Sequence, residues 1–362
     1  MFGCGGRGRW IADLFTRHGG YQVVATCDYF ADRAARCGEE HKVPAERRFS
    51  GLEGYKRLLA DRPDAVAVES PPYFHPRQAV AAVEAGCHVY LAKPVAVDVP
   101  GCLAVEAAGK AATAKDLCLL VDFQTRADKL YQEAVRRVLA GDLGPVVSGE
   151  AVYYCGPTWS DSAELDADPT NQELRLRNWG IDRILSGDII TEQNIHALDV
   201  ACWLIDKNPV GAVGTCGRKA RKGAGTCNDH FGVLFNFPDD VLVTFASKQY
   251  GIGYNDIGCR MFGPRGTVDT HYFGDVKILG HKPYRGGKVV GLYTNGAAQN
   301  VATFHDCISQ GKFDNPTVPQ SVRSNLTTIL GRTAAYRRQP VTWDEMIETK
   351  EELEADLSGL KA

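Results

Sequence analysis

Glu192 and His196 are the side chains of this sequence whose types and spacing best fit acid–base chemistry. Their i, i+4 spacing places both on one face of a helix predicted over residues 189–205, with Asp199 three residues further along. Histidine is suited to removing a proton from a secondary alcohol near neutral pH, and Glu192 can orient the imidazole or contact a hydroxyl group. The alternative is a core histidine satisfied by a helix neighbour. No metal site is expected, because this spacing provides two ligands and no third is indicated.

Lys93 is a third candidate for the same chemistry. It follows the apolar run 87–91 and precedes Pro94. An ammonium group can hydrogen-bond a hydroxyl or a developing alkoxide. Ligands of parallel sheets bind at the carboxyl ends of the strands, which is where this lysine is expected. The alternative is a surface lysine that ends a strand.

Three glycines near the start of the chain, Gly3, Gly5 and Gly8, have the spacing of a dinucleotide-binding fingerprint, and Asp28 follows at about the expected 20-residue distance. Gly3 permits the tight turn, Gly5 lets the backbone approach a pyrophosphate, and Gly8 lets the next helix pack closely. The phosphates then lie at a helix N-terminus. Asp28 can accept both ribose hydroxyls and repel a 2′-phosphate, so we expect NAD, with NADP less favoured.

The elements that must position these groups alternate in the first third of the chain. Strands are predicted at 21–28, 64–69, 87–91 and 117–122, with helices at 31–41, 52–61, 76–86 and 99–114. Such βα alternation predicts a doubly wound parallel sheet, a Rossmann domain.

The position of the fingerprint is unusual, because only Met1 and Phe2 precede Gly3. The strand that should come first is central in such a sheet. Its loss would leave a gap of about 9–10 Å with unpaired backbone on both sides. We therefore expect the first strand to lie upstream of Met1.

The pattern changes after about residue 125. Longer alternating strands follow at 145–156, 209–219, 229–237, 240–249, 257–263, 266–272 and 275–279, with helices at 189–205 and 317–338. Short turns between several of these strands indicate an open, mainly antiparallel sheet. We therefore expect two domains, a dinucleotide-binding domain over 1–125 and a substrate-binding and oligomerisation domain over 126–362.

Taken together, four motifs resemble those of the glucose–fructose oxidoreductase / inositol 2-dehydrogenase / rhizopine-catabolism (Gfo/Idh/MocA) family. They are the glycine fingerprint, Ser70-Pro-Pro-Tyr-Phe-His75, Ala92-Lys93-Pro94 and Glu192-Gln-Asn-Ile-His196-Ala-Leu-Asp199, with Phe123-Gln124-Thr-Arg126 as a further match. The sequence departs from the family in two places. Ala92 stands where the family has a glutamate, and Glu192 and Asn194 replace the aspartate and glycine of Asp-x-Gly-x-His. The first departure leaves the orientation of Lys93 open.

The resemblance implies an NAD(P)-dependent oxidoreductase that transfers a hydride between nicotinamide and a secondary hydroxyl of a sugar, cyclitol or sugar derivative. In that interpretation His196 removes the hydroxyl proton and Lys93 steadies the oxygen. One alternative is a redox-neutral enzyme that retains NAD, either an epimerase or an oxidation–elimination glycosidase. Another alternative is a non-catalytic nucleotide-binding sensor, although a sensor needs neither Lys93 nor His196.

The predicted site residues fall into three groups. The catalytic candidates are Lys93, His196 and Glu192. The predicted cofactor-binding residues are Gly3, Gly5, Gly6, Arg7, Gly8, Asp28, Ser70, Pro71, Pro72, His75, Lys93 and Gln124. The predicted substrate-binding residues are Arg126, Trp159, Trp179, Arg183, Glu192 and His196, because aromatic plates and guanidinium groups can hold a polyhydroxylated ring. Open alternatives are a structural His75, arginines that pair with nearby acidic residues, and a weakening of the NAD preference by Arg7 or Arg33.

Composition excludes several classes of partner. The net charge of −3 provides no footprint for nucleic acid, and no apolar run is long enough to span a bilayer. Twelve scattered cysteines without metal-binding spacing indicate reduced thiols and favour a cytoplasmic location, although an upstream export signal would escape notice. We expect a carbohydrate or polyol substrate, with neither a nucleic-acid nor a membrane partner.

The predicted sheet of the second domain also suggests self-association. The two predicted helices can cover only one of its faces, and an exposed apolar patch is typical of an interface. Apolar strand residues are Val233, Leu234, Phe235, Leu242, Val243 and Phe245. We expect a homodimer or homotetramer, and the alternative is a solvated outer face that carries Asn228, His230 and Lys248.

Overall fold

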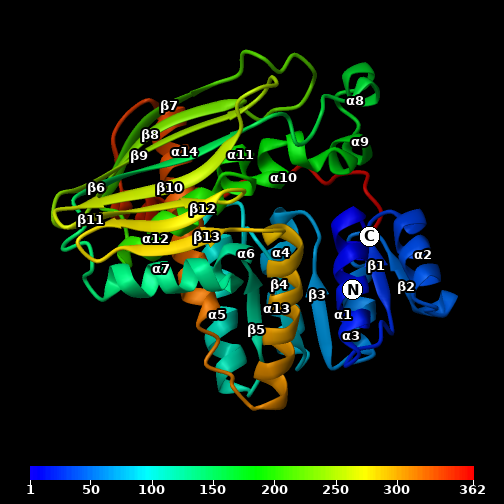
Figure 1. The fold of residues 1–362 in the computed structure, drawn as a ribbon. Coiled ribbons are helices and arrows are strands. Elements are labelled where there is room, and N and C mark those ends of the chain that lie inside the picture. Colours follow the sequence, from blue (N-terminus) through cyan, green and yellow to red (C-terminus); the bar gives the residue numbers. More distant parts are fainter.

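The chain combines a parallel-stranded unit with a nine-stranded, mainly antiparallel sheet (Figure 1), and the computed structural model describes residues 1–362. The helices are α1 Gly6–His18, α2 Ala31–Glu40, α3 Gly54–Ala60, α4 His75–Glu84, α5 Val99–Ala114, α6 Gln124–Ala127, α7 Lys129–Leu139, α8 Ala163–Ala167, α9 Gln172–Arg177, α10 Arg183–Ser186, α11 Asp188–Glu192, α12 Ile195–Ile205, α13 Leu292–Ser309, α14 Thr317–Arg337 and α15 Trp343–Thr349. The strands are β1 Thr26–Asp28, β2 Arg48–Ser50, β3 Ala65–Val68, β4 His88–Ala92, β5 Leu119–Asp122, β6 Ser148–Cys155, β7 Gly211–Gly217, β8 His230–Phe237, β9 Val241–Gln249, β10 Asp256–Gly263, β11 Gly266–His271, β12 Asp275–Gly280, β13 Tyr284–Lys288 and β14 Val341–Thr342.

The parallel unit has the predicted Rossmann arrangement. Strand β1 pairs in parallel with β2, and β3, β4 and β5 pair in parallel in that order. Helices alternate with the strands along the chain, so the carboxyl ends of β1, β3, β4 and β5 share one edge (Figure 1). Fully buried side chains on β4 and β5 reflect a sheet that is covered on both faces.

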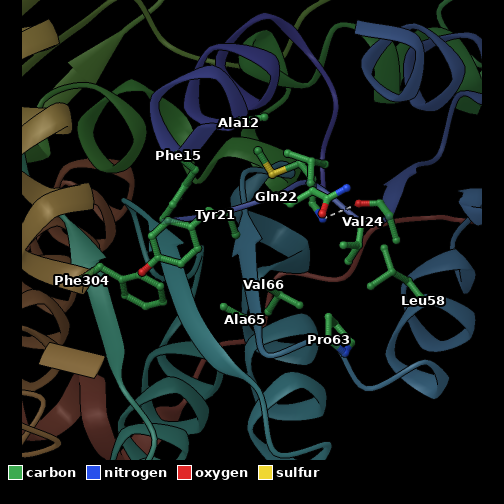
Figure 2. Close-up of a pocket in the computed structure, with 14 residues that line it drawn as sticks. Ala12, Phe15, Tyr21, Gln22, Val24, Leu58, Pro63, Ala65, Val66 and Phe304 are labelled. Carbon is green, nitrogen blue, oxygen red and sulfur yellow. Dashed lines mark hydrogen bonds between the residues drawn. The ribbon is translucent and has the colours of Figure 1, made fainter. Parts of the chain in front are cut away.

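Strands β1 and β3 do not pair with each other, and the space between them is where the gap was expected. Met1 and Phe2 occupy this space only near the carboxyl ends of the two strands. Phe2 bridges Cys27 on one side and Val68 on the other. Strand β1 is shorter than the predicted 21–28, and its three residues are those that pair with Arg48–Ser50 of β2. Below Met1 and Phe2 lies an apolar pocket that is open to solvent and holds about 570 Å³ of free space, part of it open solvent (Figure 2). Its lining includes Met1, Ala12, Phe15, Tyr21, Val23, Val24, Ala25, Leu58, Ala65, Val66, Ala67 and Phe304.

The nine-stranded sheet has the order β13-β12-β11-β10-β6-β9-β8-β7-β14, and β6–β9 is its one parallel pair. Helices α12 and α14 pack on one face. Val233, Phe235, Val243 and Phe245 are buried on that side, so they do not contribute to an outer patch. Leu242 alternates with them and is 44% exposed. The outer face is thus less apolar than the sequence suggested.

Two later parts of the chain return to the parallel unit. Helix α13 packs against α1 and β5 (Figure 1). After α15 the segment 350–362 runs back toward β1, where Leu52 N–H donates to the Lys361 carbonyl at 2.9 Å. A domain division between residues 125 and 126 therefore remains a prediction. None of the helices is both long and apolar enough to cross a membrane.

Candidate active site

The glycine turn has the close approaches that the fingerprint requires. Gly3 has φ +80°, and a Cβ there would lie 2.5 Å from the Glu69 backbone. A Cβ at Gly8 would lie 1.8 Å from the Gly3 carbonyl oxygen. At Gly5 and Gly6 an added Cβ would meet no atom within 4 Å, so these residues face open space at the N-terminus of α1. That arrangement leaves helix N–H groups accessible to an anion such as a pyrophosphate.

Asp28 is held by the backbone at the end of β1. Its Oδ2 accepts from the Cys4 N–H at 2.7 Å, and its Oδ1 accepts from the Phe30 N–H at 2.9 Å. Burial raises the pKa of Asp28, and these two bonds act in the opposite direction. The carboxylate borders a cavity of about 620 Å³, here called the Asp28 cavity. The other lining residues include Gly3, Gly5, Tyr29, Phe30, Arg33, Leu52, Tyr55, Glu69, Ser70, Pro71, Phe74, Leu176 and Trp179.

A second, larger hollow of about 1140 Å³, the His196 cavity, continues from the first. Glu69, Ser70 and Trp179 border both cavities. Its other lining residues are Arg7, Pro72, His75, Ala92, Lys93, Gln124, Tyr153, Thr158, Trp159, Glu192, Gln193, His196, Ile257, Tyr272, Phe273 and Tyr293. The two cavities form one groove along the carboxyl edge of the parallel strands, and it ends at the predicted catalytic trio.

Lys93 and Glu192 form an ion pair across this groove. The Lys93 Nζ lies 2.9 Å from the Glu192 Oε1, and the two side chains are 9% and 8% exposed. The predicted helix 189–205 is broken, because α11 ends at Glu192 and α12 begins at Ile195. Glu192 therefore faces Lys93 rather than the imidazole. Glu192, from the second unit, thus provides the carboxylate that is absent at Ala92. This carboxylate orients the Lys93 ammonium group, which the sequence had left open.

His196 lies beside this pair with its Nδ1 buried and without a hydrogen-bond partner. The ring contacts Phe123 and Tyr272 edge-on, at centroid distances of 6.3 and 5.5 Å. Burial lowers the pKa of His196 well below its usual range, and the positive charges of Lys93 and Arg7 add to the effect. The imidazole is thus neutral near pH 7, the form that can accept a proton.

Asp199 does not lie on the catalytic face as predicted. It forms a buried ion pair with Arg126, with Nη2 to Oδ1 at 2.8 Å. Arg126 lines neither cavity, so the structure does not bring it to a substrate. Arg183 also lies outside both cavities, where its guanidinium stacks over Tyr336 at 4.0 Å.

The two predicted tryptophans do reach the groove, from the segment between β6 and α10. Trp159 and Trp179 both line the His196 cavity, with ring centroids 5.3 Å apart. They add aromatic surface to the cavity that the catalytic trio lines. Such surface suits the apolar faces of a sugar or cyclitol ring.

His75 and Gln124 are fixed by contacts within the protein. Nδ1 and Nε2 of His75 face the carbonyl oxygens of Pro94 and Ser70 at 2.8 and 2.7 Å, and burial lowers its pKa to about 4. Gln124 donates to Asp122 at 3.1 Å. Both side chains line the His196 cavity, and their contact with a cofactor remains a prediction.

Several residues of this cavity were not among those predicted from the sequence. Tyr153 and Gln193 meet in it, with the Tyr153 hydroxyl donating at 2.6 Å, and Tyr272 reaches it from the turn after β11. Glu69 was also missed, although a carboxylate at the carboxyl end of a parallel strand was a recognisable signal. Burial raises the pKa of Glu69 to about 7, against the opposing charge of Arg7.

Comparison with known proteins agrees with this architecture. Residues 1–123 match the model of an oxidoreductase family with an NAD-binding Rossmann fold, and residues 131–269 match the GFO/IDH/MocA C-terminal domain. Inositol 2-dehydrogenase 3 of Saccharopolyspora erythraea is 30% identical over 252 residues, which span 69% of this chain and 65% of that protein. Myo-inositol dehydrogenase Hyg17 of Streptomyces leeuwenhoekii is 28% identical over 276 residues, which span 75% of each.

Solved structures of low sequence identity share the fold. The aldose-aldose oxidoreductase from Caulobacter crescentus, complexed with glycerol, has a TM-score of 0.71 at 21% identity, with 92% of this chain and 95% of that chain covered. The two matching domain models, together with the groove, lead to one conclusion. The chain belongs to the Gfo/Idh/MocA oxidoreductase family.

Proposed function

We propose that the protein is an NAD-dependent dehydrogenase that oxidises a secondary hydroxyl of a sugar, cyclitol or sugar derivative. The observation that carries this proposal is the placement of His196, Lys93 and Glu192 around one cavity that continues from the Asp28 cavity. The named dehydrogenases to which the chain is similar act in the same chemical class.

The residues of the groove fit a dinucleotide. Gly5 and Gly6 leave space and free N–H groups for phosphates, and Asp28 offers carboxylate oxygens to a ribose. When bound, nicotinamide supplies the hydride acceptor. The chain itself supplies position and proton transfer, which are the contributions that follow from the observed geometry.

In the proposed mechanism two side chains, His196 and Lys93, act on the substrate hydroxyl. The neutral imidazole of His196 accepts the hydroxyl proton. The Lys93 Nζ donates a hydrogen bond to the oxygen as negative charge develops on it, and Glu192 Oε1 holds that Nζ in place. Trp159 and Trp179 pack against the ring and restrict its orientation.

A redox-neutral enzyme that retains NAD is the second candidate, and one observation favours it. Parts of the second unit close over the Asp28 cavity. The Tyr29 hydroxyl donates to Glu173 at 2.7 Å, and Leu176 and Trp179 line the cavity. Segment 350–362 also reaches this region, through the bond between Leu52 and Lys361. A cofactor enclosed in this way would dissociate slowly.

Incubation with a panel of sugars and cyclitols in the presence of NAD separates the candidates. Accumulation of NADH with oxidised product supports the dehydrogenase. Product without net NADH supports the retained-cofactor enzyme, and no turnover on the panel by protein that binds NAD favours a sensor. The His196→Ala variant is the matched control, because it should bind NAD and turn substrate over far more slowly than the wild type.

We also propose that the protein forms a homodimer or homotetramer through the outer face of the nine-stranded sheet. Leu242 and Val213 on that face are 44% and 37% exposed, and charged residues including Glu150 and Arg260 extend it. Such a mixed surface fits a self-complementary interface. Light scattering at micromolar concentration tests the proposal, and a mass near the 39.4 kDa of one chain would contradict it.

A further inference from the structure

Both carboxylate oxygens of Glu192 have a hydrogen-bond partner. Oε1 accepts from the Lys93 Nζ at 2.9 Å, and Oε2 accepts from the Gln193 Nε2 at 2.7 Å. The Glu192 and Lys93 side chains are 8% and 9% exposed, so water contributes little to their solvation. A buried ion pair is favourable only when further hydrogen bonds satisfy the atoms that the pair itself leaves open. The Gln193 amide provides that bond at Oε2.

The Gln193 amide is in turn fixed by Tyr153. Its Oε1 accepts from the Tyr153 hydroxyl at 2.6 Å. An ionised carboxylate can only accept hydrogen bonds, so the amide nitrogen must face Glu192 and the amide oxygen must face the hydroxyl, which donates. Burial raises the pKa of Tyr153 well above its usual range, which keeps the proton on this hydroxyl near neutral pH. The bonds therefore run in one direction, from Tyr153 through Gln193 to Glu192.

The backbone holds this hydrogen-bond chain from a strand at one end and from a helix terminus at the other. Tyr153 lies on β6, which pairs with both β9 and β10, so an inner strand of the nine-stranded sheet carries the hydroxyl. Glu192 and Gln193 lie where α11 ends. Neighbouring side chains of a continuous helix do not face each other, whereas here both line the His196 cavity. Tyr153 thus ties the end of α11 to a fixed position in the sheet.

The Lys93 ammonium group depends on where the Glu192 carboxylate lies. Its Nζ donates both to Glu192 Oε1 and to the Glu192 backbone carbonyl. An ammonium group has three N–H donors, so one is left for a ligand in the cavity. The direction of this remaining N–H is set by the other two bonds. A rotation of the Glu192 carboxylate would therefore turn it away.

We propose that Gln193 and Tyr153 are positioning residues, which hold the Glu192 carboxylate and through it direct the remaining Lys93 N–H at the substrate oxygen. They raise kcat without contacting the reacting atoms. The effect on kcat rests on the proposed dehydrogenase function, whereas the hydrogen-bond chain itself can be tested without substrate.

Acetylation of Lys93 by acetic anhydride, followed by mass spectrometry, tests the hydrogen-bond chain in the absence of substrate. The exposed Lys110 is the internal reference. Gln193→Met removes the amide and keeps a side chain of similar length. Glu192 can then turn away, and an amine that loses its carboxylate is protonated less of the time. The ratio of Lys93 to Lys110 acetylation should rise roughly 3- to 10-fold in Gln193→Met and about 2-fold in Tyr153→Phe.

Kinetics on a substrate from the sugar panel separate positioning from a general structural role. In Gln193→Met we expect kcat to fall about tenfold, while KM for the sugar and the dissociation constant of NAD stay the same. The double variant with Tyr153→Phe should match Gln193→Met alone in kcat and in acetylation, because the hydroxyl acts only through the amide.

Tyr154→Phe is the matched control. Tyr154 is the next residue of β6, so it points to the opposite face of the sheet, where it lines a different hollow. The same substitution at this position should leave acetylation and kinetics as in the wild type.

An unchanged acetylation ratio in Gln193→Met would overturn the proposal, as would single-variant effects that multiply in the double variant. A rise in KM without a change in acetylation would also overturn it, because Gln193 would then contact the substrate itself. If no sugar on the panel is turned over, the proposed function fails while the acetylation ratios still report on the hydrogen-bond chain.

Discussion

The two ends of the groove are built by different means. At the Asp28 end the binding groups are backbone N–H groups and glycines within the first 30 residues, and the carboxylate itself is fixed by Cys4 and Phe30. At the His196 end the groups are side chains brought together from the end of β4, from α11 and from α12. Local motifs therefore determine the first end, whereas the second depends on how the two units of the chain pack together.

The ion pair between Lys93 and Glu192 illustrates this difference. The residues are 99 positions apart, and the break between α11 and α12 turns Glu192 toward Lys93. Helical spacing alone paired Glu192 with His196. The residues of such a site can be predicted from the sequence, whereas the contacts among their side chains cannot.

Loss of His196 should have the largest effect at the side-chain end. We expect His196→Ala to lower kcat by about 10²–10⁴, the contribution of a positioned general base, while NAD affinity stays the same. Because burial lowers the pKa of His196, its neutral form persists as the pH falls. Wild-type kcat/KM should therefore not fall between pH 8 and pH 6 through this group. Stopped-flow and steady-state kinetics check both points, and a wild-type rate in the variant would refute the assignment.

Removing the carboxylate opposite Lys93 should have the next largest effect. Glu192→Gln breaks the ion pair but preserves the size of the side chain, so we expect kcat to fall about 10- to 100-fold, as for loss of a charged hydrogen bond. Ala92→Glu in that background returns a carboxylate beside Lys93 and should recover part of the rate.

The recovery distinguishes orientation of Lys93 from a general structural role of Glu192. If kcat of the double variant stays at the level of Glu192→Gln while thermal unfolding is unchanged, Glu192 acts on something other than Lys93.

Asp28→Ala probes the backbone-built end and should have a smaller effect. The change removes the ribose acceptor and the charge that opposes a 2′-phosphate, so the preference for NAD over NADP should narrow about tenfold. Fluorescence titration of both cofactors measures this preference. Tighter binding of NADP by the wild type would contradict the expectation.

The features that could be predicted from the sequence are the locally determined ones, as at the Asp28 end of the groove. The parallel strands and the glycine turn were predictable because their signals are local: Gly3 has positive φ, and Gly8 packs against the Gly3 carbonyl. The antiparallel strands were predictable from alternation, which reports a single buried face. The packing between the units was not, since it depends on contacts distant in sequence. Arg126 was predicted at the substrate, but Asp199 holds it elsewhere.

The smallest effect concerns the apolar pocket beneath the Asp28 end, next to Met1 and Phe2. The Met1 α-amino group donates to the Ala25 carbonyl at 3.0 Å, and burial lowers its pKa. Beyond it lies the apolar cavity between β1 and β3 (Figure 2).

Four apolar β-branched residues added before Met1 would move the charge of the α-amino group away, pair with the backbone of residues 22–25 and fill the cavity. The free energy of unfolding should rise by about 0.5–2 kcal/mol, the usual gain from cavity filling. Urea denaturation measures the gain, and a Gly-Ser extension of equal length is the control. Equal stability of the two extended proteins would mean that the cavity does not accept a strand.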